Sequence, residues 1–464
     1  MQTNLIYADP WIHDPRVTAF FTTRAGNASV PEEREGMLRE AGVSALPAVT
    51  LKQIHGDGIV CIQQSDLEGL GLSRLGARVE LADQDGLITN VKDLVLLTRH
   101  ADCLPVYLVD AKRTAVGMVH AGWRGTNLGI SAKAALQMSQ EFHIDPWDLE
   151  AWIGPGICQN CFEAGPEVAE SFRKNSPFAV EPFLRSGRED RVHIDLAGIN
   201  ASYLRSVGVT RIWQSRRCTC CQAESFFSYR REGAVAGRMA AGICLHRIRI
   251  AIDGPSAAGK STLAKALAKE LAIDYIDTGA MYRAIGFQFA KLQVDLNQGE
   301  QVDQALERTS IDFARGAIFL DGIDVSKEIR SRECARLASE VSSLPAVRKK
   351  LVQLQRAMAE SKSIVMDGRD IGTNVLPDAE WKFFLSADPR ERARRRHLEL
   401  LEKGQTSSLE EIQKEIEERD HKDIHRDLDP LRKAEDAIEI DTTGLTIQET
   451  IDKILEQMKR DQRE

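Results

Sequence analysis

The chain has 464 residues, of which 43% are hydrophobic and 28% charged, and its formal net charge is −8. This length predicts two to four domains, at roughly 100–200 residues per domain, with cores large enough to fold without disulfides or metals. The acidic balance argues against a general nucleic-acid binder, which usually presents a basic face. The sequence contains no apolar run of about 18 residues and no basic N-terminal segment followed by an apolar one. We therefore expect no membrane span, no signal peptide and a cytoplasmic location.

The composition of the chain changes near residue 247. Eight of the nine cysteines and five of the six tryptophans precede this point. No flexible linker rich in proline, glycine and serine separates the two parts. We therefore predict two units of separate origin, residues 1–246 and residues 247–464, connected by a short joint.

Three side chains in the first unit lie at the ends of apolar segments, where catalytic groups are often held. His55 follows an apolar segment, Cys103 lies between two of them, and His120 closes another before a helix expected at 131–141. Two imidazoles and one thiolate suit a catalytic zinc with an open fourth position. Ordinary packing of these residues is the alternative. We interpret the nearby His100 as a packing residue.

Four further cysteines form two pairs with metal-ligand spacing, Cys158 with Cys161 and Cys218 with Cys221. This spacing could indicate a structural zinc site, but the glycines that flank the first pair favour an ordered loop. Because cytoplasmic thiols are normally reduced, we expect no disulfides.

The landmarks of the first unit resemble the purine nucleoside phosphorylase family, formerly called laccase-domain or polyphenol oxidase proteins. They are, in chain order, QIHGD, ADCLPV, HAGWRGT, IGPGICQNCFEAG, RCT and FFSYRREGAVAGRMA. The resemblance implies a single α/β sandwich domain with Zn²⁺ bound by His55, Cys103 and His120. It also implies action on purine nucleosides, by phosphorolysis with inorganic phosphate or by deamination of adenosine. Arg24 and Arg124 become candidate contacts for phosphate or substrate.

Two chemistries remain open for this candidate site. Zinc lowers the pKa of bound water toward about 7 and would supply a nucleophile for deamination, with Asp102 as a supporting acid or only a turn residue. Alternatively, Cys103 is the nucleophile and His120 its base in an amide hydrolase. That activity would edit peptidoglycan precursors, to which relatives of the family are linked. A multicopper oxidase is less favoured because the histidines are few.

The second unit begins with a nucleotide-binding pattern. A predicted strand at 248–253 is followed by a G-x-x-x-x-G-K-S loop and a predicted helix at 262–271, which is the context that this motif requires. The glycines let backbone N–H groups surround phosphate oxygens, and Lys260 and Ser261 are placed for the terminal phosphates and Mg²⁺. The predicted ATP-binding residues of this segment are Gly254, Pro255, Ser256, Ala257, Ala258, Gly259, Lys260, Ser261 and Thr262.

Residues 247–464 resemble bacterial cytidylate kinases over their whole length. The matching segments are IDGPSAAGKST, DTGAMYRA, DVSKEIR, ASEVSSLPAVRKKL, DGRDIGT and ERDHKDIHRDLDPL. The resemblance implies a doubly wound, parallel-sheet P-loop kinase with a lid and a monophosphate-binding insert near residues 300–342. It would transfer the γ-phosphoryl group of ATP to CMP or dCMP. We expect small-molecule partners and neither nucleic acid nor membrane.

The same resemblance assigns the residues of the kinase site. Lys260, Asp367 and Arg369 are the candidate catalytic groups, with Asp367 near Mg²⁺. The candidate CMP-binding residues are Thr278, Tyr282, Arg283, Arg330, Ser339, Arg348, Arg369, Asp370, Arg419, Asp423 and Arg426. The predicted lid arginines are Arg392, Arg394, Arg395 and Arg396, of which Arg392 and Arg396 are the named ATP contacts. The alternatives are another small-molecule P-loop kinase or a binding module that no longer catalyses. The last segment, roughly 390–464, is expected to be a charged helical stretch.

Overall fold

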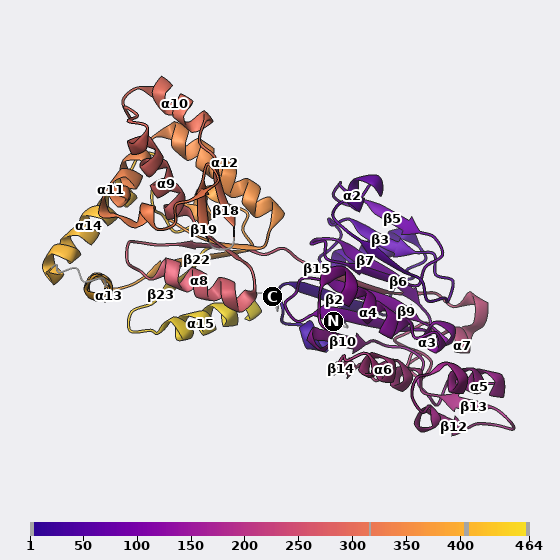
Figure 1. Ribbon diagram of the computed structural model, residues 1–464. Helices are drawn as coiled ribbons and strands as arrows, with labels where there is room; N and C mark the ends of the chain where they lie inside the picture. The colour runs from indigo at the N-terminus through magenta and orange to yellow at the C-terminus, as the bar shows by residue number, and fades with distance from the viewer. Residues whose placement is uncertain (1–3, 315–316, 403–407, 461–464) are drawn as a thin grey trace. The chain divides into compact units, whose positions relative to one another are not determined.

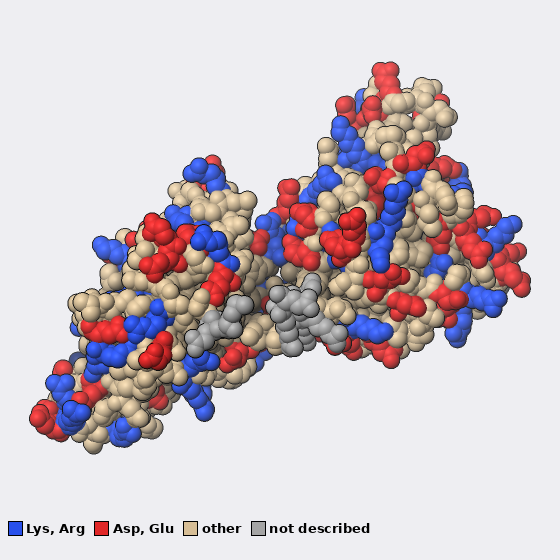
Figure 2. Space-filling model, turned by 180° about the vertical axis from the view of Figure 1, so that it is seen from behind, with Lys and Arg blue, Asp and Glu red and all other residues tan. Residues whose placement is uncertain are grey.

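The computed structural model describes residues 4–314, 317–402 and 408–460. The chain divides into two compact units, Met1–Arg247 and Ile248–Glu464 (Figure 1). No helix within the described ranges is long and apolar enough to cross a membrane. Lys and Arg side chains are interspersed with Asp and Glu over the face shown in Figure 2.

Two six-stranded sheets form the centre of the first unit. In spatial order the first sheet contains β1 (Leu5–Tyr7), β2 (Val17–Thr22), β15 (Met239–Leu245), β7 (Val95–His100), β3 (Ala48–Leu51) and β5 (Arg78–Leu81). The second contains β14 (Arg211–Gln214), β10 (Leu149–Ile153), β8 (Leu104–Asp110), β9 (Val116–Ala121), β6 (Gly86–Thr89) and β4 (Ile59–Ile62). Both sheets mix parallel and antiparallel pairs.

Within the described residues of the first unit, seven α-helices and a small third sheet surround these two sheets. The helices are α1 (Pro31–Glu40), α2 (Asp66–Gly69), α3 (Trp123–Asn127), α4 (Ile130–Phe142), α5 (Pro166–Asn175), α6 (Leu196–Ser206) and α7 (Tyr229–Glu232). The small sheet contains β11 (Glu163–Ala164), β13 (Val192–Ile194) and β12 (Leu184–Ser186). Residues of α1 pack on the outer face of the first sheet, and residues of α4 and α6 on the outer face of the second.

Strand β8 shows why this arrangement is stable. All seven of its residues are buried. Leu104, Val106 and Leu108 face the core that contains α4, whereas Tyr107 and Val109 face the core between the two sheets. Because side chains alternate along a strand, a strand covered on both faces has a continuous apolar sequence. The α/β sandwich predicted for this unit is confirmed.

The second unit is built on a five-stranded parallel sheet. Its spatial order is β17 (Asp274–Asp277), β21 (Ile364–Asp367), β16 (Arg249–Asp253), β22 (Trp381–Ser386) and β23 (Ile438–Asp441). Its helices are α8 (Lys260–Leu271), α9 (Thr278–Lys291), α10 (Gly299–Glu307), α11 (Arg332–Val341), α12 (Pro345–Ser361), α13 (Pro389–Glu402), α14 (Leu409–His425) and α15 (Ile447–Arg460).

Helices cover both faces of this parallel sheet. In β16, Ile250 and Ile252 pack with residues of α8 and α15, and Ala251 packs with residues of α9 and α12 on the opposite face. This layered arrangement confirms the predicted α/β class with a doubly wound parallel sheet. Loops at the carboxyl ends of such strands form the binding crevice of these folds.

Two peripheral parts complete the second unit. The predicted insert near 300–342 contains α10, α11 and a small sheet of β18 (Ile311–Ala314), β19 (Ala317–Leu320) and β20 (Ile323–Asp324); residues 315–316 lie outside the described residues. The second part is the segment at roughly 390–464, for which a charged helical stretch was expected, and this expectation is only partly correct.

Strand β23 interrupts the helices of this segment. Ile438 and Ile440 alternate with two exposed acidic residues, a pattern typical of a strand at the edge of a sheet.

Candidate active sites

The first candidate site collects His55, Cys103 and His120 from three separate segments. Their nearest nitrogen and sulfur atoms all lie within 4.8 Å of one another. His55 follows β3, Cys103 lies in the turn between β7 and β8, and His120 lies near the end of β9. His55 is exposed and His120 is buried, so the group is open on one side. Two imidazoles and a thiolate at this separation can hold a borderline-soft metal such as zinc.

Asp85 holds this group in place, and sequence reasoning missed it. Its buried carboxylate accepts hydrogen bonds from the backbone N–H groups of Ile54, His55 and Gly56 at 3.2, 3.1 and 2.7 Å. It also accepts from Nδ1 of His120 at 2.8 Å. An ionised carboxylate only accepts, so Nδ1 carries the proton and Nε2 of His120 is left for a metal.

The electrostatics of the group favour a thiolate. Burial opposes ionisation of Cys103, but the neighbouring His120 and His55 overcome it and lower the pKa of the thiol to about 6. Burial likewise opposes a charge on His120, and the negative charges of Cys103 and Asp85 raise its pKa to about 9. The deprotonated sulfur is both the metal-binding and the nucleophilic form of cysteine.

Gly122 leaves the space in which a ligand could reach the group. A Cβ atom at this position would lie 3.0 Å from Sγ of Cys103 and 3.1 Å from a ring carbon of His55. Both neighbours are candidate ligands, and Asp85 holds the backbone of His55 in place. A side chain on residue 122 would therefore crowd the site.

The nearby His100 and Asp102 are occupied by structural contacts. Nε2 of His100 bonds to the hydroxyl of Thr98 at 2.7 Å and its Nδ1 to the carbonyl of Cys103 at 2.9 Å. Burial lowers the pKa of His100 well below its usual value, so the ring is neutral. Asp102 accepts from Oγ1 of Thr219 at 2.7 Å and from the backbone N–H of Arg230 at 2.6 Å. The two carboxylate oxygens of Asp102 therefore bind the segment of Thr219 and the start of α7.

The two candidate arginines of this unit are placed differently. Arg124 is exposed and lies over the Trp123 ring, 4.4 Å from its centroid. Arg24 donates to the carbonyl of Ala223 at 2.6 Å and lies 3.5 Å from a carboxylate oxygen of Glu232. Arg124 has its guanidinium available at the helix that follows Gly122, whereas Arg24 is partly engaged.

The second candidate site is the loop after β16. Gly254 has a φ of 147°, and a Cβ there would lie 2.2 Å from the carbonyl oxygen of Leu385, so only glycine fits. Gly259 also has a positive φ, of 88°, where the loop enters α8. Nζ of Lys260 donates to the carbonyl of Pro255 at 2.6 Å. Burial and the charge of Arg369 lower the pKa of Lys260, so a bound phosphate would restore its favoured charged form.

Ser261 and Asp367 form a pair of oxygen donors beside this loop. Oγ of Ser261 donates to the Asp367 carboxylate at 2.7 Å, and the hydroxyl of Tyr275 donates to its other oxygen at 2.8 Å. Burial and the charge of Asp277 raise the pKa of Asp367. A hard cation such as Mg²⁺ binds oxygen donors of this type and would offset the buried charge.

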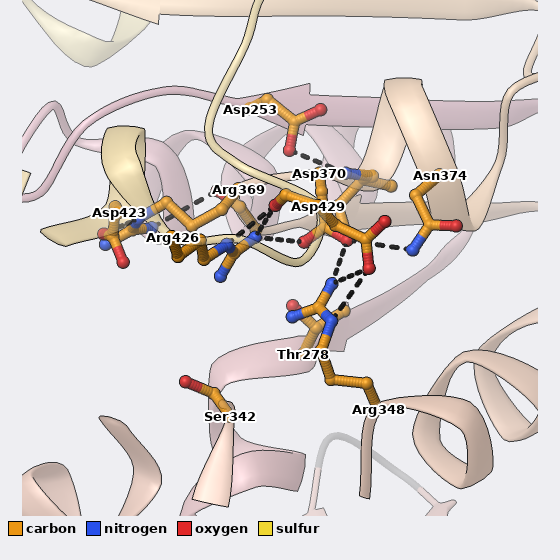
Figure 3. A network of polar contacts seen from close by, with 12 residues as sticks. Asp253, Thr278, Ser342, Arg348, Arg369, Asp370, Asn374, Asp423, Arg426 and Asp429 are labelled. Atoms are coloured by element: carbon orange, nitrogen blue, oxygen red, sulfur yellow. Dashed lines mark hydrogen bonds and ion pairs between the residues drawn. The ribbon is translucent and has the colours of Figure 1, made fainter. Parts of the chain in front are cut away.

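Arginines and aspartates form a network at the same edge of the sheet (Figure 3). Asp370 pairs with Arg348, a contact that both partners bury, and with Arg426 at 3.0 Å. Arg348 reaches Asp429 as well, from Nε to Oδ2 at 2.9 Å. The network includes predicted residues from three distant parts of the sequence.

A second arginine–aspartate pair, Arg369 with Asp423, lies beside the phosphate loop. Arg369 donates from Nε to Asp423 at 2.6 Å and from Nη2 to Oγ of Ser256 at 3.0 Å. Arg419 is exposed, and within the described ranges it makes no hydrogen bond or ion pair. Arg419 therefore offers an uncommitted guanidinium, and arginines in such positions make bidentate contacts with phosphate.

The remaining predicted CMP contacts lie on the helices around the network. Thr278 begins α9 and donates to the carbonyl of Asp367 at 2.6 Å. Arg283 pairs with Asp277 at 3.1 Å, and burial raises the pKa of Tyr282 to about 12. Arg330 and Ser339 are both exposed on the insert.

The predicted lid arginines differ in burial: Arg392 is buried beside the phosphate loop, and Arg394 and Arg396 are exposed. Arg392 donates to the carbonyl of Ser256 at 3.0 Å and pairs with Asp420, which accepts the backbone N–H of Ser256 at 2.8 Å. Asp420 was not expected from the sequence. Arg395 donates to the carbonyl of Thr442 at 2.7 Å, whereas Arg394 is exposed. Arg396 pairs with Glu399 at 2.7 Å on an exposed face of α13.

The two parts of the chain match different families of known proteins. Residues 20–246 match the model of the family described as multi-copper polyphenol oxidoreductase laccase, and residues 250–460 match that of cytidylate kinase. The cytidylate kinase of Desulfitobacterium hafniense (strain Y51) is 50% identical over 211 residues, covering 45% of this chain and 91% of that protein. That of Bacillus thuringiensis (strain Al Hakam) is 49% identical over 213 residues, covering 45% and 95%. The structure of Bacillus licheniformis hypothetical protein YfiH is 29% identical with a TM-score of 0.47, covering 52% of this chain and 97% of that chain.

Proposed function

The chain belongs to the laccase-like family over its first unit and to the cytidylate kinase family over its second, and we propose that it is a bifunctional enzyme of nucleotide metabolism. The proposed domains are residues 1–246 and residues 247–464. In this proposal each unit performs its own reaction on small molecules. The products, a free purine base or deaminated nucleoside and a cytidine diphosphate, are not consecutive, so substrate channelling does not follow.

The second unit transfers the γ-phosphoryl group of ATP to CMP or dCMP. The observation that carries this proposal is the arginine–aspartate network of Arg348, Asp370 and Arg426 beside the phosphate loop. Asp370 and Asp423 hold the guanidinium groups in fixed orientations before substrate binds. A bound CMP phosphate then meets arginines that are already positioned, which lowers the cost of binding in the reactive geometry.

Lys260, Arg369 and Arg419 offset negative charge during transfer. Charge spreads over the equatorial oxygens of the phosphoryl group as it moves in line from ATP to the CMP phosphate. Fixed cationic groups aimed at those oxygens stabilise the transition state without reorganisation. When bound at Ser261 and Asp367, Mg²⁺ supplies further charge neutralisation. Closure of the lid helices α13 and α14 excludes water as a competing acceptor.

A nucleotide panel tests the kinase proposal. ADP release is measured with the full-length chain, ATP and Mg²⁺, using CMP, dCMP, UMP and AMP as separate acceptors. We expect CMP and dCMP to give the highest kcat/KM. A preference for another monophosphate would favour a different P-loop kinase. Absence of ADP release with every acceptor would contradict the kinase proposal.

The first unit cleaves purine nucleosides with phosphate, deaminates adenosine, or does both. His55, Cys103 and His120 are the proposed zinc ligands, supported by their mutual distances and the hydrogen bond from His120 to Asp85. Bound zinc would supply Lewis-acid chemistry and lower the pKa of a coordinated water. Asp85 fixes the tautomer of His120, and Gly122 keeps the site open to substrate.

Product analysis separates the two reactions of this unit. The full-length chain is incubated with adenosine, guanosine or inosine, with and without phosphate. Release of free base only when phosphate is present indicates phosphorolysis, whereas inosine formed from adenosine without phosphate indicates deamination. If neither free base nor inosine forms in any mixture, the proposal is contradicted.

The low pKa of Cys103 favours one alternative, a cysteine-dependent amide hydrolase. In that reaction the thiolate attacks the amide carbon, and His120 donates a proton to the departing amine. Metal removal distinguishes the two functions. A chelated, metal-free chain that still hydrolyses an amide of a peptidoglycan precursor, and that loses this activity in Cys103→Ala, would establish the alternative.

A further inference from the structure

Four cysteines outside both candidate active sites converge in the first unit. Cys158 and Cys161 lie in the loop after β10, and Cys218 and Cys221 lie in the turn after β14. These two strands pair in parallel, and the pairing continues as a bridge between Gly156 and Cys218. The fold therefore brings together two C-x-x-C segments that are distant in sequence.

The four sulfur atoms have the spacing of a tetrahedral site. All four lie within 4.8 Å of one another. Sγ of Cys221 is 3.4 Å from that of Cys161 and 3.8 Å from that of Cys158. A zinc–sulfur bond of about 2.3 Å in a regular tetrahedron requires sulfur atoms about 3.8 Å apart. All four cysteines are free thiols.

Backbone N–H groups already point at one of these sulfurs. The amides of Cys158 and Cys221 donate to Sγ of Cys218 at 3.3 and 3.4 Å. Cys218 is the buried member of the four, so these two amides meet its sulfur away from solvent. Hydrogen bonds from outside the ligand set orient and tune a metal-binding thiolate.

We propose that Cys158, Cys161, Cys218 and Cys221 bind one structural zinc ion. A set of four thiolates fills the coordination shell and leaves no position for water or substrate, as in other structural zinc sites. The glycines near the first pair favour an ordered loop without metal, whereas the convergence of the four sulfur atoms supports the metal site. The assignment stands independently of the reaction proposed for the first unit.

This zinc would hold two loops against the segment that carries Cys103. The backbone N–H of Ile157 donates to the carbonyl of Asp102 at 2.8 Å, and Thr219 donates to the Asp102 carboxylate at 2.7 Å. Ile157 precedes one cysteine ligand and Thr219 follows another. Two residues adjacent in sequence to the cysteine ligands therefore position Asp102, which precedes Cys103 in the chain.

Metal content of the full-length chain tests the assignment. In the variant His55→Ala/Cys103→Ala the first candidate site cannot contribute, so we expect about one zinc per chain, from the four thiolates. Adding Cys161→Ser and Cys221→Ser should reduce zinc to near zero. The matched control is Cys220→Ser, which removes an adjacent thiol outside the cluster and should retain the metal.

A cobalt spectrum gives a second measurement that does not depend on comparing the stability of variants. The His55→Ala/Cys103→Ala chain, loaded with Co²⁺, should show the thiolate-to-cobalt charge-transfer absorption of four sulfur ligands, and Zn²⁺ should displace it. If the metal-free chain lacks that absorption after Co²⁺ has been added, the proposal is overturned. A disulfide between Cys161 and Cys221 in freshly purified protein, or iron in place of zinc, would overturn it as well.

Discussion

The two candidate active sites prepare their functional groups in opposite ways. In the second unit the arginines are paired with carboxylates, as Arg348 and Arg426 are with Asp370. In the first unit the candidate metal-ligand set is held by one carboxylate, Asp85, which accepts hydrogen bonds from three backbone N–H groups and one imidazole. Paired charges can be exchanged for phosphate oxygens, whereas an imidazole locked in one tautomer keeps a nitrogen ready for a metal. Substitutions that remove a charge should therefore affect the two sites differently.

The largest effect is expected from Lys260→Ala. This change removes the buried ammonium group next to the phosphate loop, and loss of one preorganised charge donor costs about 10²–10³-fold in kcat. ADP release with saturating CMP and ATP measures it. Nucleoside turnover by the same variant should be unchanged, because Lys260 belongs to the second unit. A kcat within about threefold of the parent would contradict the assigned role.

The next effect is expected from Arg348→Ala, which removes a buried arginine from the network. We expect the KM for CMP to rise by about 10²-fold, because truncating one partner of a buried charge pair costs about 2–5 kcal/mol. The KM for ATP should change much less. The matched control is Lys349→Ala, which removes an exposed charge from the same helix. Equal increases in KM for both nucleotides would indicate a general structural defect.

A smaller effect is expected from Asp85→Asn. The NH₂ group of the new amide would face either the backbone N–H groups or the N–H of His120 Nδ1, and two donors cannot bond to each other. His120 would lose its fixed orientation, so zinc affinity should fall by about 10–100-fold. Competition with a chromogenic chelator measures this affinity, in a chain that also carries Cys161→Ser and Cys221→Ser so that only the first site binds zinc. Asp83→Asn removes an exposed acid two residues earlier and should leave the affinity unchanged. Unaltered zinc binding in Asp85→Asn would show that Asp85 does not position His120.

The smallest effect is expected from Arg396→Ala. To contact ATP, Arg396 must leave its exposed pair with Glu399, and exposed pairs contribute at most about 1 kcal/mol. An exposed contact of Arg396 with a phosphate of ATP should contribute a similar amount, so we expect the KM for ATP to rise about two- to fivefold in the variant. Arg394→Ala, on the same helix, serves as the comparison. A rise above tenfold for Arg396→Ala would make this residue a principal ATP ligand.

The sequence was most informative where the chemistry lies in one contiguous segment. Residues 254–261 predicted both the loop and the helix after it, because the glycine conformations and the helix start are local properties. The triad of His55, Cys103 and His120 was identified from residue type and family resemblance. The distances among the three side chains depend on β3, β7, β8 and β9, which belong to two sheets, and no local pattern determines them.

Residues that act through long-range contacts were not predicted. Asp85 and Asp420 are single acidic residues without a motif, and their roles arise only when backbone amides distant in sequence meet their carboxylates. The repeated C-x-x-C spacing was a usable signal for the thiol cluster. The glycines beside the first pair favoured an ordered loop instead, and the parallel pairing of β10 with β14, which joins the two segments, is not visible in the sequence.

The contact of the lid helices with Ser256 has a thermodynamic consequence for the kinase. Arg392 from α13 and Asp420 from α14 bind the carbonyl and the amide of the same loop residue. The loop and these helices therefore share one equilibrium, in which ordering one favours ordering the other. Linkage is reciprocal: if ATP on the loop favours a helix position, that helix position favours ATP by the same free energy.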